Sequence, residues 1–587
     1  MTLTSVPPVL QSVHSDPAPE SQTSRAHRGP ASTRIEAWAV FGVSFVAYFI
    51  VAMLLDFKYH SFVGDAVARM ANGFYMLHSR DPHLAAVGFV WNPLSSVSDL
   101  PLLLFNSWFP MLASHNVAGT TVSSLAMAGA AYQIWALLQE WGLQAAPRLL
   151  LTALFAFDPM VLYFGGNGMS EALYLFCMLA AARYLSRWLK GNDLPSLVYA
   201  AIALGFGYLE RSEPIAAAGL AVPLIFLVTF SRSSENRRLR IWAGLTDVTI
   251  FLLPILTAFV GWALVSYVIT GAPFQQFTSK YGNATLLANS DQKPTTLHIR
   301  LVHEAKAIAY MAPLLVLIVV LALAVAVVRR NIGVAAVVAI LSGGLGFTLA
   351  SYAANAIFDW YRYYILVAPI AVLLVGSLFA VPVRLRMLRE QSEPSVVPVT
   401  KQSPLALKVA GSVAACVVSV ALLGASFPAT VMAMTNFNMA PDVVQYTGWF
   451  LFPNQHLNVL TIQAKYSYGQ VESMSKYLEN RHFANGDVVV DNANSCIPNV
   501  DTNVTNPRIF VIHNDRDFER ALADPLTFHA HYLLVGLASD SDAILGLYPN
   551  IARASWVKLV HTFNYPSGGF CNGFKLYKVI GHPTQNY

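Results

Sequence analysis

IEAWAVFGVSFVAYFIVAMLL, residues 35–55, carries one charged side chain, Glu36, in a run long enough to cross a bilayer as a helix. Similar runs recur along the chain, which has 587 residues, 55% of them hydrophobic and only 12% charged. A soluble chain would carry about 25% charged residues. The composition therefore predicts a polytopic α-helical membrane protein.

Apolar windows of this kind predict about 11 membrane spans. They lie near 35–55, 117–138, 148–165, 169–187, 195–209, 213–230, 244–268, 307–328, 332–353, 363–381 and 409–429. The fifth and sixth windows are short and separated only by ERSE, so they could form one broken pair. Residues 1–34, which are rich in Ser, Pro and Ala, are expected to be a disordered cytoplasmic segment.

Basic residues predict the orientation of the spans. With the N-terminus in the cytoplasm, the inner segments carry roughly twice as many Lys and Arg residues as the outer loops. Basic turns such as SRSSENRRLR (231–240) then all fall inside. We expect an integral protein of a bacterial plasma membrane with its C-terminal region outside. The net charge of +5 largely reflects this bias and gives no reason to expect a nucleic-acid partner.

The region 431–587 differs from the helical region 35–430 that precedes it. Amphipathic stretches such as VESMSKYLENRHF alternate with short apolar runs such as DVVVD and RIFVIH. This alternation predicts a compact α/β domain, which would lie on the outer face. Cys496 and Cys571 both fall in it, and an oxidising compartment would let them pair; two free thiols are the alternative.

With this topology, the unusual polar residues all lie on the outer side. Charged groups at membrane depth are costly unless they are paired or wet, so their convergence indicates a lined cavity or a site. The candidates are Asp65, Arg69, Asp81, His83, Trp91 and Asn92 in the first outer loop, Glu210 and Arg211 in a short turn, Lys280 in a longer loop, and Arg362 and Tyr363 in the last turn.

Asp65 is the candidate for acid–base chemistry. It follows Gly64 and precedes the amphipathic run AVARMANGFYMLH, which places its carboxylate near the start of an interfacial helix. A helix N-terminus favours the ionised form, as a general base needs. Asp is also a common helix cap at such positions, and the two roles do not exclude each other.

Arg362, within WYRYY, is the candidate for binding a phosphate, because a guanidinium can pair with it bidentately. Its aromatic neighbours, Tyr363 among them, could contact a sugar or simply anchor the chain at the interface. Lys280 could also approach a phosphate or be solvated, and Glu210 and Arg211 could belong to an ion pair that supports a helix break. No metal-ligand spacing is present and no cofactor is implied, although outer carboxylates could hold a divalent ion.

These features, in this order, resemble the GT-C superfamily of membrane glycosyltransferases, which use polyprenyl-phosphate-linked sugars. VGDAVARMANG supplies the acidic residue of the first outer loop. VWNPL (90–94), GYLERSEPIAAAGLAVPL (207–224), TGAPFQQFTSKYG (270–282) and WYRYYILVAPIAVLL (360–374) are similar to elements of the protein O-mannosyltransferase and lipid A aminoarabinose transferase branch. The sequence departs from that branch at Asn92-Pro93-Leu94 and at Arg211-Ser212-Glu213-Pro214.

The resemblance implies an inverting sugar transfer on the outer face of the membrane. Asp65 would deprotonate an acceptor hydroxyl on a glycan, lipid or protein, and the polyprenyl phosphate would leave towards Arg362 and Lys280. The other candidates would support the site or contact the acceptor. A transporter or flippase for lipid-linked sugars is the first alternative, although transporters usually place binding groups near the midplane. A non-catalytic membrane scaffold with an outer binding domain is the second.

Overall fold

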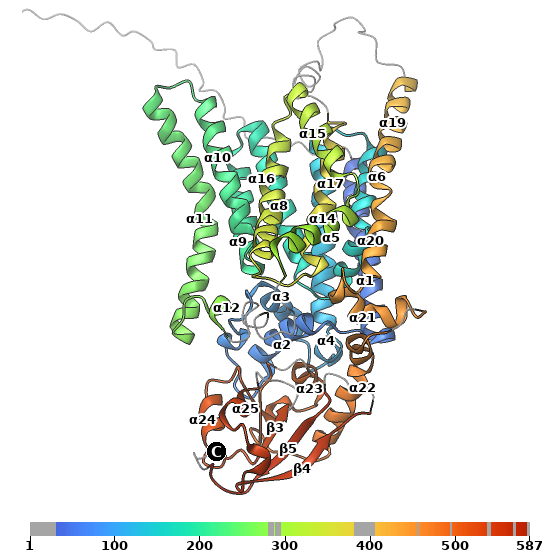
Figure 1. Cartoon of the computed structure of the whole chain (residues 1–587). Coiled ribbons are helices and arrows are strands. Elements are labelled where there is room, and N and C mark those ends of the chain that lie inside the picture. Colours follow the sequence, from blue (N-terminus) through green and yellow to red (C-terminus); the bar gives the residue numbers. More distant parts are fainter. Residues whose placement is uncertain are drawn as a thin grey trace, which may run out of the picture.

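The computed structural model describes residues 31–279, 287, 295–380, 405–454, 457–493, 496–536, 542–566 and 571–583. A bundle of long helices occupies one end of the molecule, and a small sheet domain occupies the other (Figure 1). Short helices from the first loop lie between the two (Figure 1). The helical and α/β regions predicted from the sequence are therefore both present.

The long helices follow the apolar windows of the sequence. They are α1 (Ala31–Met53), α5 (Val117–Glu140), α6 (Ala145–Ala156), α7 (Pro159–Gly166), α8 (Glu171–Gly191), α9 (Leu194–Glu210), α10 (Pro214–Arg232), α11 (Arg237–Thr270), α14 (Leu297–Met311), α15 (Leu315–Arg329), α16 (Gly333–Ala353), α17 (Val367–Ser377), α19 (Leu405–Leu423) and α20 (Ser426–Met434). Each expected window overlaps one of these helices or a consecutive pair of them.

Among the described residues, six helices are long and apolar enough to cross a membrane, or up to eight if each of two bent pairs counts as one span. The bends are 62° between α6 and α7 and 72° between α14 and α15. Helices α9 and α17 are apolar but short, and α8 carries charged residues. The predicted number of 11 spans is therefore not reproduced by length and composition alone and stays a prediction.

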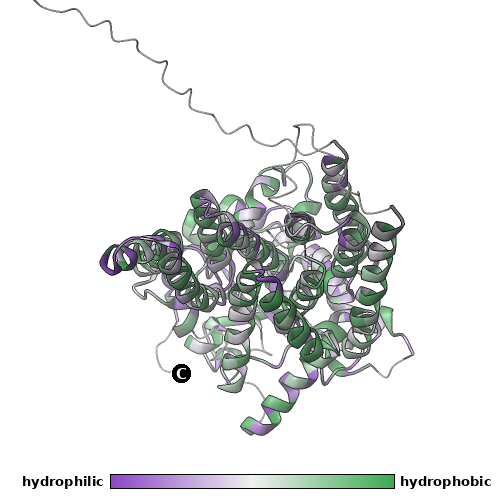
Figure 2. Cartoon of the chain, turned by 90° about the horizontal axis from the view of Figure 1, so that it is seen from above, coloured by the Kyte–Doolittle hydropathy of each residue, from purple (hydrophilic) through white to green (hydrophobic). Residues whose placement is uncertain are grey.

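The outer surface of the bundle is apolar, as a lipid-facing surface should be. Helix α11 exposes Leu253, Val260 and Leu264, each more than half accessible. Seen from the end of the bundle, hydrophobic residues dominate most of the helices (Figure 2). This surface would aggregate in water, and a bilayer removes that cost.

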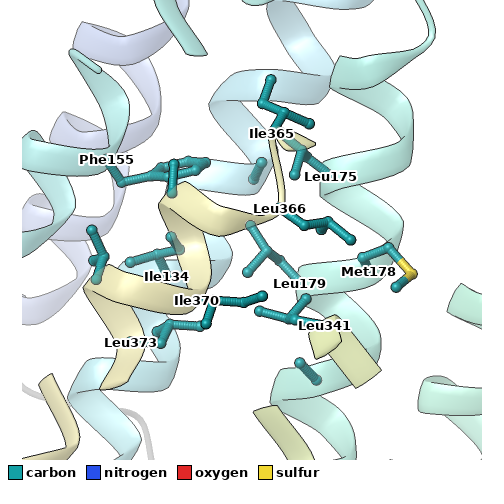
Figure 3. Packing of buried hydrophobic residues seen from close by; sticks show 14 of the residues in the cluster. Ile134, Phe155, Leu175, Met178, Leu179, Leu341, Ile365, Leu366, Ile370 and Leu373 are labelled. Carbon is teal, nitrogen blue, oxygen red and sulfur yellow. The ribbon is translucent and has the colours of Figure 1, made fainter. Parts of the chain in front are cut away.

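The interior of the bundle packs around α8 and α17. Ile370 and Leu373 of α17 lie among side chains of α5, α6, α8 and α16, including Leu179 and Leu341 (Figure 3). Close contact between helices requires small residues at some positions. At Gly343 of α16, an added Cβ would lie 2.6 Å from a backbone atom of α10, so no larger residue fits there.

The short helical elements lie between the long helices or follow α20. They are the π-helical turn η1 (Leu54–Tyr59), α2 (Gly64–His78), η2 (Leu84–Val87), α3 (Leu94–Leu103), α4 (Met111–Ser114), α12 (Gln275–Thr278), η3 (Tyr361–Tyr364) and α21 (Pro441–Leu451). Helix α2 buries Val67, Met70 and Phe74 in a core shared with the sheet domain. This shared core joins the bundle to the domain.

The C-terminal domain is a five-stranded mixed sheet in the order β2-β1-β3-β5-β4. Its strands are β1 (Val488–Val490), β2 (Phe510–Ile512), β3 (Tyr532–Gly536), β4 (Val557–Phe563) and β5 (Phe574–Val579). The first three pair in parallel, and β5 is antiparallel to both β3 and β4. Its helices are α22 (Val459–Glu479), α23 (Ile497–Asn503), α24 (Phe518–Ala523) and α25 (Ala543–Leu547), with short 3₁₀ turns η4 (Pro507–Ile509) and η5 (Ile551–Arg553).

Candidate active site

Asp65 lies in the first turn of α2, and its side chain does not cap the helix. The N-cap position is Val63, and no side chain accepts a capping hydrogen bond there. Instead, the backbone N–H of Gly64 donates to the hydroxyl oxygen of Tyr446 in α21 at 3.3 Å. A carboxylate in the first turn interacts favourably with the helix dipole without capping. The capping alternative is therefore wrong, and the carboxylate is available for another contact.

That contact is Arg362, which lies in η3 and is only 5% exposed. Its Nη2 donates to Oδ2 of Asp65 at 2.9 Å, across 297 positions of sequence. The Asp65 side chain keeps 32% of its accessible surface, whereas that of Arg362 keeps 6%. The carboxylate is thus the more accessible member of the pair, and its hydrogen bond with the buried guanidinium fixes its orientation.

Two further carboxylates surround the same guanidinium. Nε of Arg362 lies 3.7 Å from Oε1 of Glu171 and 3.8 Å from Oδ2 of Asp442. Burial raises the pKa of Asp442 to about 7, although Arg362 acts to lower it. Three acids therefore share one buried cation, and the raised pKa of Asp442 favours its protonated form more than that of an ordinary aspartate.

Arg211 forms a second buried cationic centre in the break between α9 and α10. Its guanidinium lies 2.6 Å from Oε1 of Glu213 and 2.9 Å from Oε1 of Glu171. The ring of Tyr363 is 5.3 Å from its Cζ. Glu171 therefore links the Arg211 and Arg362 centres. The ion pair with Glu213 agrees with the expectation of an internal pair at this break.

A third centre combines residues of α2, α3 and α9. Arg69 lies 3.8 Å from Oε1 of Glu210 and 5.2 Å from the ring centroid of Trp91. The same Glu210 oxygen accepts a hydrogen bond of 2.5 Å from Ser95. Asn92 donates to the backbone oxygen of Tyr208 in α9.

These three centres line one cavity of about 320 Å³. Its walls come from the first outer loop, the α9–α10 break, α12, the end of α16 and η3. The lining includes Asp65, Arg69, Trp91, Asn92, Glu210, Arg211, Glu213, Phe277, Phe347, Thr348, Ser351, Trp360, Arg362 and Tyr363. Most of the candidate residues taken from the sequence therefore meet around one space, although they come from three separate parts of the chain.

The chain was compared with protein families, curated proteins and solved structures. No protein-family model matches the chain, and no curated protein matches it by sequence. ArnT from Cupriavidus metallidurans, bound to undecaprenyl phosphate, is similar over 94% of this chain and 98% of its own, with 13% identity and a TM-score of 0.44.

Two structures of an archaeal enzyme give weaker similarity. The oligosaccharyltransferase AglB from Archaeoglobus fulgidus, in complex with an inhibitory peptide and a dolichol-phosphate, is similar over 86% of this chain and 70% of its own, with 10% identity and a TM-score of 0.39. The Archaeoglobus fulgidus oligosaccharyltransferase tethered with an acceptor peptide is similar over 86% of this chain and 69% of its own, with 9% identity and a TM-score of 0.40.

Asp81 and His83 lie outside the cavity, at the contact with the C-terminal domain. Asp81 accepts hydrogen bonds from the backbone N–H and the Nε of Arg516 at 3.1 and 3.0 Å. Nδ1 of His83 lies 2.6 Å from the backbone oxygen of Asp81. Lys280 lies outside the described residues, so its expected contact with phosphate stays a prediction.

The two cysteines of the C-terminal domain, Cys496 and Cys571, are joined in a disulfide. Both are buried in the core that α2 shares with the domain. As for a metal, no three His, Cys, Asp or Glu side chains of the described residues converge closely enough to hold an ion. A divalent metal therefore has no site to assign in this part of the chain.

Glu171 and Asp442 complete the charge cluster, although neither is among the candidate residues taken from the sequence. Glu171 ends the polar turn GGNGMSE, and an acid beside an apolar helix is a signal of function that could have been used. Asp442 lies in a short amphipathic helix, 377 positions after Asp65, and no local pattern marks it. Only the fold brings it to Arg362.

Proposed function

We propose that this protein transfers a sugar from a polyprenyl-phosphate donor to an acceptor hydroxyl on the outer face of the membrane. The observation that carries the proposal is the cavity in which one partly open carboxylate, Asp65, faces a space lined by three guanidinium groups. Such a space combines a candidate base with charge that suits a phosphate leaving group.

The transfer would proceed with inversion at the anomeric carbon. Asp65 would take the proton of the acceptor hydroxyl while that oxygen forms its bond to the sugar. The bond between the anomeric carbon and the phosphate oxygen would break, and its electron pair would leave with the polyprenyl phosphate. Arg362 would hold the carboxylate of Asp65 in the position from which it accepts the proton.

The position of the cavity suits a donor dissolved in lipid. Phe347, Thr348 and Ser351, at one end of α16, line it together with residues of α2. Helix α16 is one of the helices long and apolar enough to cross a membrane. A lipid-linked phosphate could therefore reach the guanidinium groups from the bilayer, while an acceptor glycan, lipid or protein enters from the side of the C-terminal domain.

We further propose the finer topology expected from the sequence. The chain would cross a bacterial plasma membrane about 11 times, with residues 1–34 in the cytoplasm, the catalytic region 35–430 in the membrane and the domain 431–587 outside. The basic turns between spans support this orientation. A buried disulfide in the C-terminal domain also agrees with an oxidising compartment.

Replacing the base tests the function. The Asp65→Asn variant, expressed in cells lacking the native protein, should accumulate the polyprenyl-phosphate sugar that the wild type consumes. Asp193→Asn provides the matched control, because Asp193 precedes α9 at the end opposite Glu210 and lies outside the cavity. Normal donor consumption by a membrane-inserted Asp65→Asn variant would refute the role of Asp65 as base.

A further inference from the structure

Asp65 and Arg69 are one turn apart on α2. Residues four positions apart on a helix lie on the same face, with about 5–6 Å between their Cβ atoms. Both side chains line the cavity. A single rigid helix therefore presents the candidate base and a cation side by side to the same space.

Arg69 lacks the hydrogen-bond partners that a buried guanidinium normally has. It is only 8% exposed, and neither its Nε nor its Nη1 has a hydrogen-bond partner among the described residues. The nearest carboxylate oxygen belongs to Glu210, at 3.8 Å, and that oxygen already accepts a hydrogen bond from Ser95. Leaving buried donors unsatisfied is costly, so an acceptor entering the cavity would be favoured here.

The other two arginines of the cavity are more fully neutralised. Arg362 has carboxylate oxygens of Asp65, Glu171 and Asp442 within 4 Å, although its Nε also lacks a hydrogen bond. Arg211 contacts Glu171 and Glu213 at 2.9 and 2.6 Å. A phosphate at either residue would have to displace a carboxylate or lie beside two or three of them. Among the described residues, Arg69 has one carboxylate within 4 Å, that of Glu210, so a phosphate bound there would lie beside fewer carboxylates than at Arg211 or Arg362.

We propose that Arg69 is the principal ligand of the donor phosphate, with Arg362 retained as the partner of Asp65. This inference rests on the proposed function. A guanidinium suits the task because its parallel N–H groups match two phosphate oxygens. Trp91 stacks near the guanidinium and would help hold its plane.

The spacing on α2 also fits an inverting displacement, in which base and leaving group lie on opposite faces of the sugar. Asp65 has a short side chain, whereas that of Arg69 is long. The carboxylate and the guanidinium can therefore be separated by more than the distance between their Cβ atoms. The sugar ring would lie between them along the helix, with its anomeric carbon facing Asp65 and its phosphate at Arg69.

A binding comparison that needs no turnover tests the inference. The full-length protein in lipid nanodiscs is titrated with decaprenyl phosphate and, separately, with decaprenol, and the ratio of the two affinities measures recognition of the phosphate. Wild type should prefer the phosphate, and Arg69→Gln should reduce this preference about tenfold, whereas Arg362→Gln should reduce it by less than about threefold. Arg69→Lys keeps the positive charge and should therefore retain part of the preference for the phosphate. It also serves as the control for a site that is disturbed by any substitution at position 69.

Glu210→Gln provides a test with the opposite sign. Gln can still accept the hydrogen bond from Ser95, but it removes the carboxylate nearest to Arg69. Binding of decaprenyl phosphate should therefore become about threefold tighter, while decaprenol binding stays unchanged. A purely structural role of Arg69 predicts no such gain.

The outcomes separate the two proposals. If wild type prefers the phosphate, but Arg362→Gln abolishes the preference and Arg69→Gln keeps it, the assignment to Arg69 is overturned and the proposed donor class stands. If wild type binds both lipids equally, the proposed polyprenyl-phosphate donor is refuted. The proposed role of Arg69 as phosphate ligand is then refuted as well.

Discussion

Arg362 illustrates how one buried charge organises the site. Its guanidinium holds Asp65 by a hydrogen bond and lies within 4 Å of Glu171 and Asp442. A buried ion pair contributes little net stability, but removing one partner is strongly destabilising because the other charge is left alone. The intact cluster therefore adds little to the free energy of unfolding, but loss of its cation should lower that free energy strongly.

Arg362→Gln should destabilise the protein by about 3 kcal/mol or more, because three carboxylates lose their common partner. Asp65→Asn should cost much less, since Arg362 keeps two acids and Asp65 is the more open member of its pair. Thermal unfolding in detergent measures both effects. Adding Asp442→Asn to Arg362→Gln should restore part of the loss; a double variant no more stable than the single one would contradict this account.

Asp442 should make stability depend on pH. Its pKa is about 7 in the folded protein because of burial, compared with 3.8 for a solvated aspartate. The stabilisation by the protonated carboxyl is fully present below about pH 4 and is lost as the pH rises through about 7. Asp442→Asn should therefore gain stability relative to wild type between about pH 5 and about pH 8. Melting temperatures measured in parallel test this, and a constant difference between the two proteins would argue against it.

At the scale of elements, α2 has two tasks. One face presents Asp65 and Arg69 to the cavity, while Val67, Met70 and Phe74 pack in the core shared with the C-terminal domain. The chain leaving α2 then contacts the domain through Arg80, which pairs with Asp515 at 3.3 Å and also with Asp517, and through Asp81. Movement of the domain would therefore be transmitted to the helix that carries the candidate base.

The contact between Asp81 and Arg516 can be tested by exchanging charges. Asp81→Arg places two guanidinium groups together, so the domain should dock less tightly and limited proteolysis of the C-terminal domain should accelerate. Arg516→Asp in the same chain should reverse this by restoring an opposite pair. Arginine hydrogen bonds lower the pKa of Asp81 to about 2, so the native pair should persist on acidification until about pH 2. Equal cleavage of all three proteins would exclude a docking role.

For the whole molecule, the disulfide stabilises the C-terminal domain. Cys496 and Cys571 are 75 positions apart, and both belong to the core that also contains α2 side chains. Closing a loop of this length restricts the unfolded chain considerably. The cross-link therefore supports the contact between bundle and domain as well as the sheet.

Replacing both Cys496 and Cys571 by Ser should lower the stability of the C-terminal domain by about 4 kcal/mol, according to the loop-entropy relation. Denaturant unfolding of the full chain, followed by Trp fluorescence, measures the difference. Cys177→Ser is the matched control, since that thiol is buried and free. If the double variant unfolds at the same denaturant concentration as wild type, the cross-link contributes nothing to stability.

The positions of the helices and strands, and the charged residues of the candidate site, can be predicted from the sequence alone. Helices lie where apolar runs are long, because each span must satisfy its own backbone hydrogen bonds. The strands lie where short apolar runs alternate with amphipathic ones. Asp65, Arg69, Arg211 and Arg362 stood out because charged side chains are rare beside apolar runs.

The contacts between these charged residues arise from the packing of the helices and are not visible in the sequence. The Asp65–Arg362 pair spans 297 positions, and no local pattern predicts which buried cation serves which acid. The fold also brings Glu171 and Asp442 within 4 Å of Arg362. Asp81, in contrast, contacts Arg516 of the C-terminal domain. The physical reason is that the side chains of a short segment determine its own helix or strand, whereas charge pairing depends on which segments the packed helices bring together.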